Sequence, residues 1–286
     1  MDEKLHAAQE SRIQIQGMEL ALACPDELPF RWIGQKDVLD QLLASWLVIH
    51  PADIPLNPRL VGKPGVGKTT LAYAAAKQLN RDVYIFQCTM DTRPEDLLIT
   101  PVVASTGNIR YVASSLVTAM IKGGVCILDE GNRMSEKSWA SLAPLLDARR
   151  YIESIIAGLK IAAHPDFRIC VTTNEDASTF EIPEYIHSRL QPQIYLEFPE
   201  AEEEKRILQE NLPFVEENII DYVVTFLQKA HGHNENYTVR DGINIARYTA
   251  KRLSTLPSKT ADRESLLRQA IVMTLGDEAL IFTPNE

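Results

Sequence analysis

The sequence predicts an α/β fold in which helices flank a parallel sheet, followed by a small C-terminal α-helical lid domain. A phosphate-binding loop at 62–70 lies between an apolar strand and a helix-forming run. Apolar strands then alternate with helical stretches as far as Pro199, which is typical of a parallel sheet covered by helices. Beyond Pro199 the pattern is helical only. We therefore expect an N-terminal extension at 1–30, an α/β nucleotide-binding core at 31–199 and a lid domain at 200–286.

The part of the chain before the phosphate loop predicts one edge strand and one helix. Residues 12–16 alternate between polar and apolar side chains, as an edge strand does. The segment 24–29 contains two prolines and breaks regular structure. Residues 38–47 favour a helix, and the prolines that follow at 51, 55 and 58 end it before the strand of the phosphate loop.

The rest of the core predicts strands and helices in turn. The expected strands lie at 83–86, 125–128, 167–171 and 194–198. The expected core helices lie near 115–122, 136–146 and 184–190, and those of the lid near 200–211, 216–231, 238–253 and 262–276.

The phosphate loop fits the pattern G-x-x-x-x-G-K-[ST] in the strand–loop–helix context that this motif requires. Its glycines let successive backbone N–H groups point at phosphate oxygens, and the following helix adds its positive end. Lys68 is expected to reach the β- and γ-phosphates, and the Thr69 hydroxyl to ligate Mg²⁺. The nucleotide-binding residues of the loop are Gly62, Lys63, Pro64, Gly65, Val66, Gly67, Lys68, Thr69 and Thr70.

Two adjacent carboxylates, Asp129 and Glu130, end the buried strand at 125–128. Catalytic groups of such sheets gather at the carboxyl ends of strands. Beside a phosphate loop, Asp129 is expected to hold the Mg²⁺ shell and Glu130 to orient and deprotonate the attacking water.

Three further polar residues are candidates for the same site, each with an alternative. Asn174 ends the strand after Val171 and can bind the attacking water or the γ-phosphate, or it is a turn residue. Arg189 closes a short helix and either reaches the site of a neighbouring subunit or is a surface arginine. Arg240 starts a lid helix and either contacts the γ-phosphate or is a solvated charge.

The bulk properties are those of a globular protein with a net charge of −10. This charge argues against nucleic-acid binding by the whole surface. No run is apolar enough to cross a membrane, and the N-terminus lacks a secretion pattern, so a cytoplasmic location is expected. The four scattered cysteines predict free thiols in a reducing compartment. His231 and His233 have no metal-ligand partner at matching spacing, so a polar turn is favoured there over a metal site.

At this point the order of motifs resembles the AAA+ ATPases, most closely the dynein-related, MoxR-like group that holds the CbbQ/NorQ-type activators. The resemblance covers about Phe30 to the last helices. Its motifs include the loop at 62–70 and the segment 32–37, whose Ile33 belongs to the apolar lining of the adenine pocket. They also include the segments 92–98 and 123–133 and a hairpin inserted at 101–114. The stretches 145–150 and 163–168 lie around a second hairpin.

The resemblance implies a role for each candidate residue. Asn174 corresponds to sensor 1, Arg189 to the arginine finger and Arg240 to sensor 2. It also implies ATP and Mg²⁺ as ligands and a homo-oligomeric ring, commonly a hexamer, because the finger acts in trans. ATP hydrolysis would remodel or activate a client protein, and MoxR-like members often work with a protein that carries a von Willebrand A domain.

Two departures from the family pattern bear on mechanism. Lys63 replaces a proline of the loop, a change that should leave the N–H cradle intact. Between Gln87 and Leu98 there is no aromatic–hydrophobic–Gly pore loop, which puts polypeptide threading in doubt. Tyr111 in the inserted hairpin is a substitute gripping aromatic or, more commonly, a strand residue facing a neighbour.

Three functions remain open on the sequence. The first is an ATP-dependent remodelling ATPase. The second is a nucleic-acid-associated, restriction-type motor subunit driven by GTP or ATP, which would need a basic groove beyond the sparse pairs Arg149-Arg150 and Lys251-Arg252. The third is a nucleotide-gated scaffold in which hydrolysis is incidental.

Overall fold

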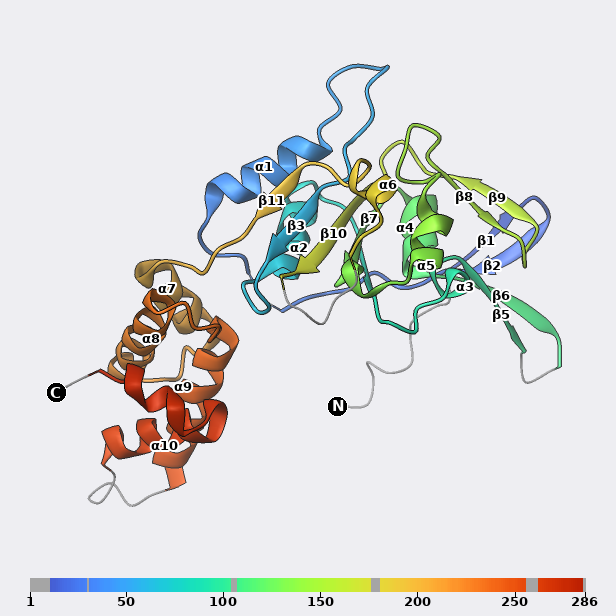
Figure 1. Ribbon diagram of the computed structural model, residues 1–286. Coiled ribbons are helices and arrows are strands. Elements are labelled where there is room, and N and C mark those ends of the chain that lie inside the picture. The colour runs from blue at the N-terminus through green and yellow to red at the C-terminus, as the bar shows by residue number, and fades with distance from the viewer. Residues whose placement is uncertain (1–10, 30, 104–106, 176–180, 256–261, 285–286) are drawn as a thin grey trace. The chain divides into compact units, whose positions relative to one another are not determined.

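The computed structural model describes residues 11–29, 31–103, 107–175, 181–255 and 262–284 (Figure 1). The start of the predicted extension at 1–10 and the centre of the inserted hairpin at 104–106 lie outside these residues. The chain divides into two compact units. The first comprises residues 11–29 together with Lys36–Gly62 and Lys68–Tyr195. The second comprises residues 31–35, Lys63–Gly67 and the chain from Leu196 onward.

The first unit is built on a parallel sheet of the strand order β11-β3-β10-β7-β4. Its strands are β3 (Arg59–Gly62), β4 (Val83–Gln87), β7 (Val125–Asp129), β10 (Arg168–Asn174) and β11 (Gln193–Tyr195). Its helices are α1 (Lys36–Trp46), α2 (Lys68–Gln78), α4 (Ser115–Lys122), α5 (Glu136–Leu142) and α6 (Glu184–His187). The central strand β10 is buried along its whole length. The predicted α/β fold, with a parallel sheet flanked by helices, is confirmed.

A second, four-stranded sheet in the order β1-β2-β6-β5 joins the N-terminal extension to the inserted hairpin (Figure 1). Its strands are β1 (Arg12–Ile15), β2 (Met18–Ala21), β5 (Ile99–Val103) and β6 (Ile109–Ala113), and α3 (Pro94–Leu97) precedes β5. The turn between β1 and β2 has φ of 51° at Gln16 and 83° at Gly17. Positive φ at both central residues is the geometry that joins two antiparallel strands with matching twist.

Several predicted elements are shorter in the structure. Helix α5 ends at Leu142, close to Pro144, whose ring cannot continue a helix. Helix α6 ends at His187, and β11 pairs with β3 only as far as Tyr195. After α5 the chain forms the hairpin of β8 (Tyr151–Ser154) and β9 (Leu159–Ala162), where only the family resemblance placed one.

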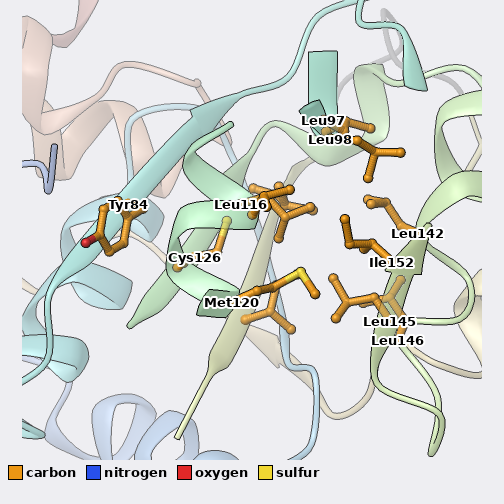
Figure 2. Packing of buried hydrophobic residues seen from close by; sticks show 14 of the residues in the cluster. Tyr84, Leu97, Leu98, Leu116, Met120, Cys126, Leu142, Leu145, Leu146 and Ile152 are labelled. Carbon is orange, nitrogen blue, oxygen red and sulfur yellow. The ribbon is translucent and has the colours of Figure 1, made fainter. Parts of the chain in front are cut away.

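The apolar core of the first unit lies around α4. Ser114 caps this helix by accepting a hydrogen bond from the Val117 N–H, and Gly123 ends it with φ 74°. Figure 2 shows Leu116 and Met120 of α4 across from Leu142 and Ile152, and all four side chains are fully buried. The N-cap serine, the C-terminal glycine and the apolar face between them are all recognisable helix signals in the sequence.

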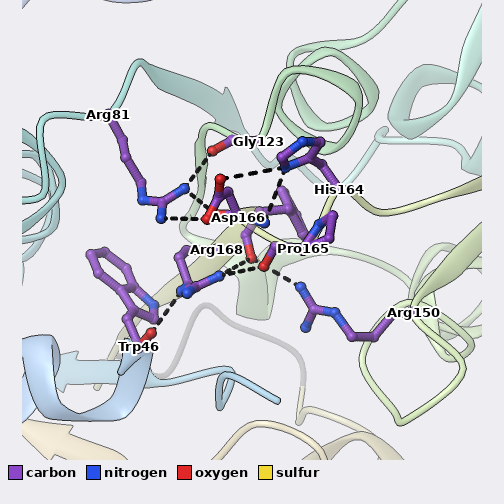
Figure 3. Close-up of polar contacts among 9 residues, drawn as sticks. Trp46, Arg81, Gly123, Arg150, His164, Pro165, Asp166 and Arg168 are labelled. Atoms are coloured by element: carbon purple, nitrogen blue, oxygen red, sulfur yellow. Dashed lines mark hydrogen bonds and ion pairs between the residues drawn. The ribbon is translucent and has the colours of Figure 1, made fainter. Parts of the chain in front are cut away.

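Three arginines tie together the loops at the amino ends of the main strands (Figure 3). The Arg168 Nε donates to the carbonyl of Trp46 at 2.7 Å, and its Nη1 donates to Pro165 at 2.9 Å. Arg81 donates to the carbonyl of Gly123 at 2.9 Å, and Arg150 to that of Phe167 at 2.9 Å. Burial lowers the pKa of Arg168 to about 10.

The second unit is mostly helical, as predicted. It contains α7 (Ala201–Asn211), α8 (Glu217–Gly232), α9 (Val239–Thr255), α10 (Arg263–Leu275) and the 3₁₀ turn η2 (Asp277–Phe282). Its core is a separate apolar cluster that includes Leu208, Val223, Phe226, Ile245 and Ile271. Among the described residues, no helix combines the length and the hydropathy that crossing a membrane would require.

Candidate nucleotide site

Strand register brings three predicted site residues to the same edge of the main sheet. Asn174, the last residue of β10, pairs with Gly62, the last residue of β3. On the other side of β10, Val171 pairs with Leu128, so that Asp129 ends β7 beside it. Because all these strands are parallel, their carboxyl ends meet at one edge. The start of the phosphate loop, the acidic pair and Asn174 therefore belong to one site.

Asp129 accepts two hydrogen bonds from threonine hydroxyls. The Thr69 Oγ1 donates to its Oδ1 at 2.6 Å, and the Thr172 Oγ1 donates to the same atom at 2.7 Å. Thr69 comes from the first turn of α2, and Thr172 from β10. The carboxylate thus joins the phosphate-loop helix to the strand that carries Asn174.

Glu130 adopts a left-handed backbone conformation, with φ 55° and ψ 45°. A non-glycine residue there is strained by about 1 kcal/mol or more, and such strain is concentrated at functional sites. Its N–H donates to the Thr172 Oγ1 at 2.9 Å. Its side chain accepts from the Asn174 Nδ2 at 3.2 Å and forms an ion pair with Arg133. The two residues predicted to handle the attacking water are therefore in direct contact.

A second asparagine fixes the backbone of Asn174. The Asn132 Nδ2 donates to the Asn174 carbonyl at 2.8 Å, and the Asn174 N–H donates to the Asn132 Oδ1 at 3.4 Å. Asn132 is 6% exposed and lies in the 3₁₀ turn η1 (Gly131–Arg133). This reciprocal pair fixes the strand end from which Asn174 reaches Glu130.

The phosphate loop has the backbone that its sequence predicts. Gly65 and Gly67 have φ of 81° and 98°, values that only glycine adopts readily. Within the second unit, a Cβ on Gly65 would lie 2.8 Å from the Thr238 side chain, and one on Gly67 would lie 3.0 Å from the Trp32 ring. Both positions are therefore restricted to glycine by conformation and by space.

The donor set at this edge fits a nucleoside triphosphate with Mg²⁺. The Lys68 ammonium, on a residue 6% exposed, donates to the Gly62 carbonyl at 2.8 Å. A lysine at the start of a helix that follows a glycine loop suits phosphate oxygens. The hydroxyl of Thr69 and the carboxylate of Asp129 are hard oxygen donors in contact, the kind that Mg²⁺ prefers.

Beneath the acids the first unit is dry. Burial raises the pKa of the Cys88 thiol, and the charges of Asp129 and Glu130 raise it further. The Cys88 N–H donates to the Asp129 carbonyl at 2.8 Å. A buried, neutral thiol therefore lies against the strand end that carries the carboxylates.

Arg189 lies apart from this cluster in its contacts. Its guanidinium donates to the carbonyl of Tyr185, one turn earlier, and its Nε lies 3.5 Å from the Asp147 Oδ2. Arg149 is the main cause that lowers the pKa of Asp147 to about 2, so this carboxylate is ionised at neutral pH. Within its own chain, Arg189 is thus an ion-pair partner of a loop residue.

Ile33 and Arg240 belong to the second unit. Ile33 is partly buried, and Arg240 is exposed in the first turn of α9. The neighbouring Thr238 touches the phosphate loop at Gly65. His231 and His233, at the end of α8, each bond a backbone carbonyl, that of Tyr237 and that of Lys229 respectively.

Sequence reasoning gave no role to three residues of the cluster: Thr172, and the Asn132 and Arg133 that lie in the family motif at 123–133. A signal existed for Thr172, since residues two apart in a strand share a face and Asn174 was already a candidate. Arg133 lies three residues after Glu130, the spacing of one helical turn, but nothing in the sequence showed that a turn would form there. Asn132 carried no signal of its pairing with the Asn174 backbone.

Comparison with known families bears on the same stretch. Residues 59–190 match the family model described as "AAA domain (dynein-related subfamily)". This stretch is an AAA-type ATPase domain. The match includes the whole phosphate loop and every residue of the Asp129 cluster, and it ends one residue after Arg189. The predicted AAA+ ATPase assignment is thereby confirmed at the level of the domain.

Individual relatives agree with this domain. An uncharacterized protein of Staphylococcus aureus is 25% identical over 179 residues, which cover 61% of this chain and 68% of the relative. One of Staphylococcus epidermidis is 25% identical over 175 residues, which cover 59% and 66%. Among solved structures, the Thermotoga maritima RuvB Holliday junction branch migration motor shares the fold, with a TM-score of 0.57 and 19% identity over 86% of this chain and 72% of that one.

Proposed function

We propose that this chain is a MoxR-like AAA+ ATPase that hydrolyses ATP and, as a ring of identical chains, remodels or activates a partner protein. The observation that carries the proposal is the contact between Glu130 and Asn174 at 3.2 Å, beside the Thr69–Asp129 pair at 2.6 Å. A water-activating acid, a polar sensor and a metal-binding pair at one sheet edge are the parts that triphosphate hydrolysis needs. A scaffold that only bound nucleotide would need no such acid.

Each residue of the cluster has one role in this proposal. Backbone N–H groups of the loop and the Lys68 ammonium bind the phosphates, and Thr69 and Asp129 hold Mg²⁺. When bound, the metal neutralises charge on the phosphate oxygens. Glu130 accepts the proton of the attacking water, and Asn174 orients that water. Thr172 keeps both acids in place through its contacts with Asp129 Oδ1 and the Glu130 N–H.

Two arginines complete the site in the proposed ring. Arg189 acts as the finger that stabilises charge on the triphosphate of the neighbouring chain, and Arg240 senses the γ-phosphate from the helical unit. Loss of the γ-phosphate then shifts the two-state equilibrium between core and lid, and this motion is transmitted to the client.

Exposed apolar side chains support a protein client. In the first unit, Val103 is 73% exposed at the end of β5, and Ile155 is 93% exposed in the β8–β9 turn. Solvent-facing branched aliphatic residues suit contact with another polypeptide. We propose a client of this kind, such as a von Willebrand A-domain protein, in the reducing cytoplasm, where the four free thiols would persist.

The test compares two single variants with the unmodified chain. We expect Lys68→Ala to abolish nucleotide binding, because it removes the buried phosphate-binding charge. We expect Glu130→Gln to bind ATP and assemble but to lose turnover by ~10²-fold or more, because it removes the general base. Affinity capture of Glu130→Gln with ATP present should then retain the client and report the subunit count. Turnover by Glu130→Gln at the unmodified rate would refute the assignment of the base.

A nucleic-acid motor is a second candidate function, because a solved structure that shares the fold of this chain is a Holliday junction branch migration motor. One of the two basic pairs that would serve it, Arg149-Arg150, is engaged in contacts within the chain. Arg149 donates to both carboxylate oxygens of Asp147. Arg150 donates to the Phe167 carbonyl, and its guanidinium carbon lies 5.7 Å from the centroid of the Phe167 ring. Salt-sensitive DNA binding that stimulates turnover would favour this candidate over the protein client. Negligible turnover in an assembled ring with its partner would instead favour the scaffold.

A further inference from the structure

We infer that Asp147 is a positioning residue for the Arg189 finger. This inference rests on the proposed function, in which Arg189 acts on the triphosphate of the neighbouring chain. Two contacts relate Arg189 to the segment Leu146–Asp147: Asn57 bridges the carbonyls of Leu146 and Arg189, and Asp147 lies beside the Arg189 side chain.

The backbone of Arg189 is held through Asn57. The Asn57 Nδ2 donates to the Arg189 carbonyl at 3.1 Å and to the Leu146 carbonyl at 2.9 Å. Asn57 is 8% exposed, so its amide is bound to these two carbonyls in a dry setting. One side chain therefore sets the spacing between residue 189 and residue 146.

The side chain of Arg189 is held through Asp147. Its Nε is buried and makes no hydrogen bond to any described residue, and the Asp147 Oδ2 lies 3.5 Å from it. The guanidinium also makes a local hydrogen bond, in which Nη1 donates to the carbonyl of Tyr185. Removing Asp147 would thus release the only contact that relates the guanidinium to another part of the fold within the described residues.

The carboxylate of Asp147 is fixed and already neutralised by Arg149. Arg149 donates from Nε to Oδ1 at 3.0 Å, from Nη2 to Oδ2 at 2.8 Å and from its N–H to Oδ1 at 3.0 Å. Leu145 and Leu146, which precede it, are 1% and 3% exposed. Because Arg149 compensates the charge, Asp147 can orient Arg189 without cancelling the positive charge that a finger must present.

The segment also continues directly into β8, which begins at Tyr151 and leads to the exposed Ile155 at the hairpin turn. Asp147 thus lies in the loop that leads into the hairpin of the proposed client surface.

The first test separates binding from turnover in the full-length ring. We expect Asp147→Asn to lower kcat by ~10-fold to ~100-fold, the cost of a finger misplaced by about 1 Å, and to leave KM for ATP within about twofold. Asp147→Glu, which restores the charge, should recover part of kcat. Asp166→Asn is the matched control, since it removes a carboxylate paired to Arg81 by 2.9 Å without touching Arg189. An unchanged or higher kcat for Asp147→Asn would overturn the inference.

The second test locates the defect in the donating chain. Lys68→Ala chains offer a finger without a working site, and Arg189→Ala chains offer a site without a finger, so mixed rings should regain turnover. Adding Asp147→Asn to the Lys68→Ala chain should remove that gain, whereas adding it to the Arg189→Ala chain should not. Equal losses in both mixtures would indicate a general structural role and overturn the inference.

Rings of a single variant separate this inference from the function on which it rests. If Arg189→Ala alone keeps the unmodified kcat in an assembled ring, the finger itself is refuted. If Arg189→Ala loses kcat while Asp147→Asn does not, the finger stands and the role of Asp147 is refuted.

Discussion

The two ends of the main sheet both carry clustered polar side chains, but these have different kinds of partner. At the carboxyl ends, Asp129, Glu130 and Asn174 contact other side chains. At the amino ends, Arg81, Arg150 and Arg168 donate mainly to backbone carbonyls (Figure 3). Side-chain partners can be exchanged for a ligand by rotating a few bonds, whereas a carbonyl in a packed loop cannot be moved aside.

The difference gives a rule for separating site from scaffold in this molecule. Buried guanidinium groups at the amino ends bind carbonyls of loops far apart in sequence, such as Trp46 and Pro165, and their loss should cost stability. Clustered hydroxyls, carboxylates and amides at the carboxyl ends should instead be needed for turnover. Glu130, the residue with strained backbone, is at this second end.

The largest expected effect tests the carboxyl end at Thr172. Replacing Thr172 with valine keeps the shape but removes the donor to Asp129 Oδ1 and the acceptor of the Glu130 N–H. We expect kcat to fall by ~10²-fold, because both acids lose the group that orients them. Steady-state ATPase assays on the purified ring, beside a thermal melt, measure the two quantities separately.

The matched control is Thr173→Val. Thr173 is the next residue, equally buried, and its hydroxyl donates to the Leu60 carbonyl at 3.3 Å on the neighbouring strand. By the rule above, this change should lower stability by about 1 kcal/mol and leave kcat within about twofold. Equal losses of kcat in the two variants would show that position in the strand, and not the kind of partner, decides function.

A smaller effect, on stability alone, is expected at the amino end. Arg168→Met leaves the carbonyls of Trp46, Pro165 and Phe167 without this donor in a site where the residue is 6% exposed. We expect the free energy of unfolding to fall by about 3 kcal/mol and kcat of the folded ring to stay within about twofold. Urea unfolding followed by fluorescence, with ATPase assays below the transition, makes the measurement.

Arg12→Met provides the comparison for Arg168→Met. Arg12 pairs with Glu19 at 2.8 Å on the surface, with about half of each side chain exposed, so its loss should cost about 0–1 kcal/mol. A drop in kcat at Arg168 with no change in stability would break the proposed division between the two ends.

The sequence predicted the carboxyl end well because its signals are local. A glycine loop after a strand and two acids after another strand are each contiguous, and the parallel register then forces Gly62, Asp129 and Asn174 together. The same reasoning extended to Thr172 by strand periodicity would have found it. The turn at Gln16–Gly17, which adds β2 to the extension, also had a local signal in its glycine.

Contacts between distant segments had no such signal. Asp147 meets Arg189 only because α5 ends early and the following loop returns to α6. The arginines at the amino ends carried no signal of their partners, since any residue type can supply a backbone carbonyl. The family resemblance supplied the role of Arg189 but not the residue that holds it.

Glu204 in the helical unit differs from both groups, because this buried carboxyl has too few hydrogen-bond partners, whether side chain or backbone. It is fully buried, its Oε2 accepts from the Gln228 Nε2 at 2.8 Å, and its Oε1 has no hydrogen-bond partner in the part of the chain that the structure describes. Burial raises its pKa to about 7 from an ordinary value of 4.5. The folded state then holds the proton of Glu204 more tightly than the unfolded state does. The contribution of Glu204 to the free energy of unfolding is therefore highest at low pH and falls as pH rises from about 4.5 to about 7.

Glu204→Gln should remove this loss, because an amide has no charge to desolvate. At pH 8 we expect the variant to be more stable than the unmodified chain by about 2 kcal/mol, with the advantage shrinking toward pH 5. Unfolding monitored by circular dichroism across this range measures it, and Glu202→Gln, two residues earlier on the exposed face of α7, is the control. A lower stability of Glu204→Gln at pH 8 would contradict this prediction. It would mean that the folded state stabilises the ionised carboxylate, so that burying its Oε1 costs no free energy.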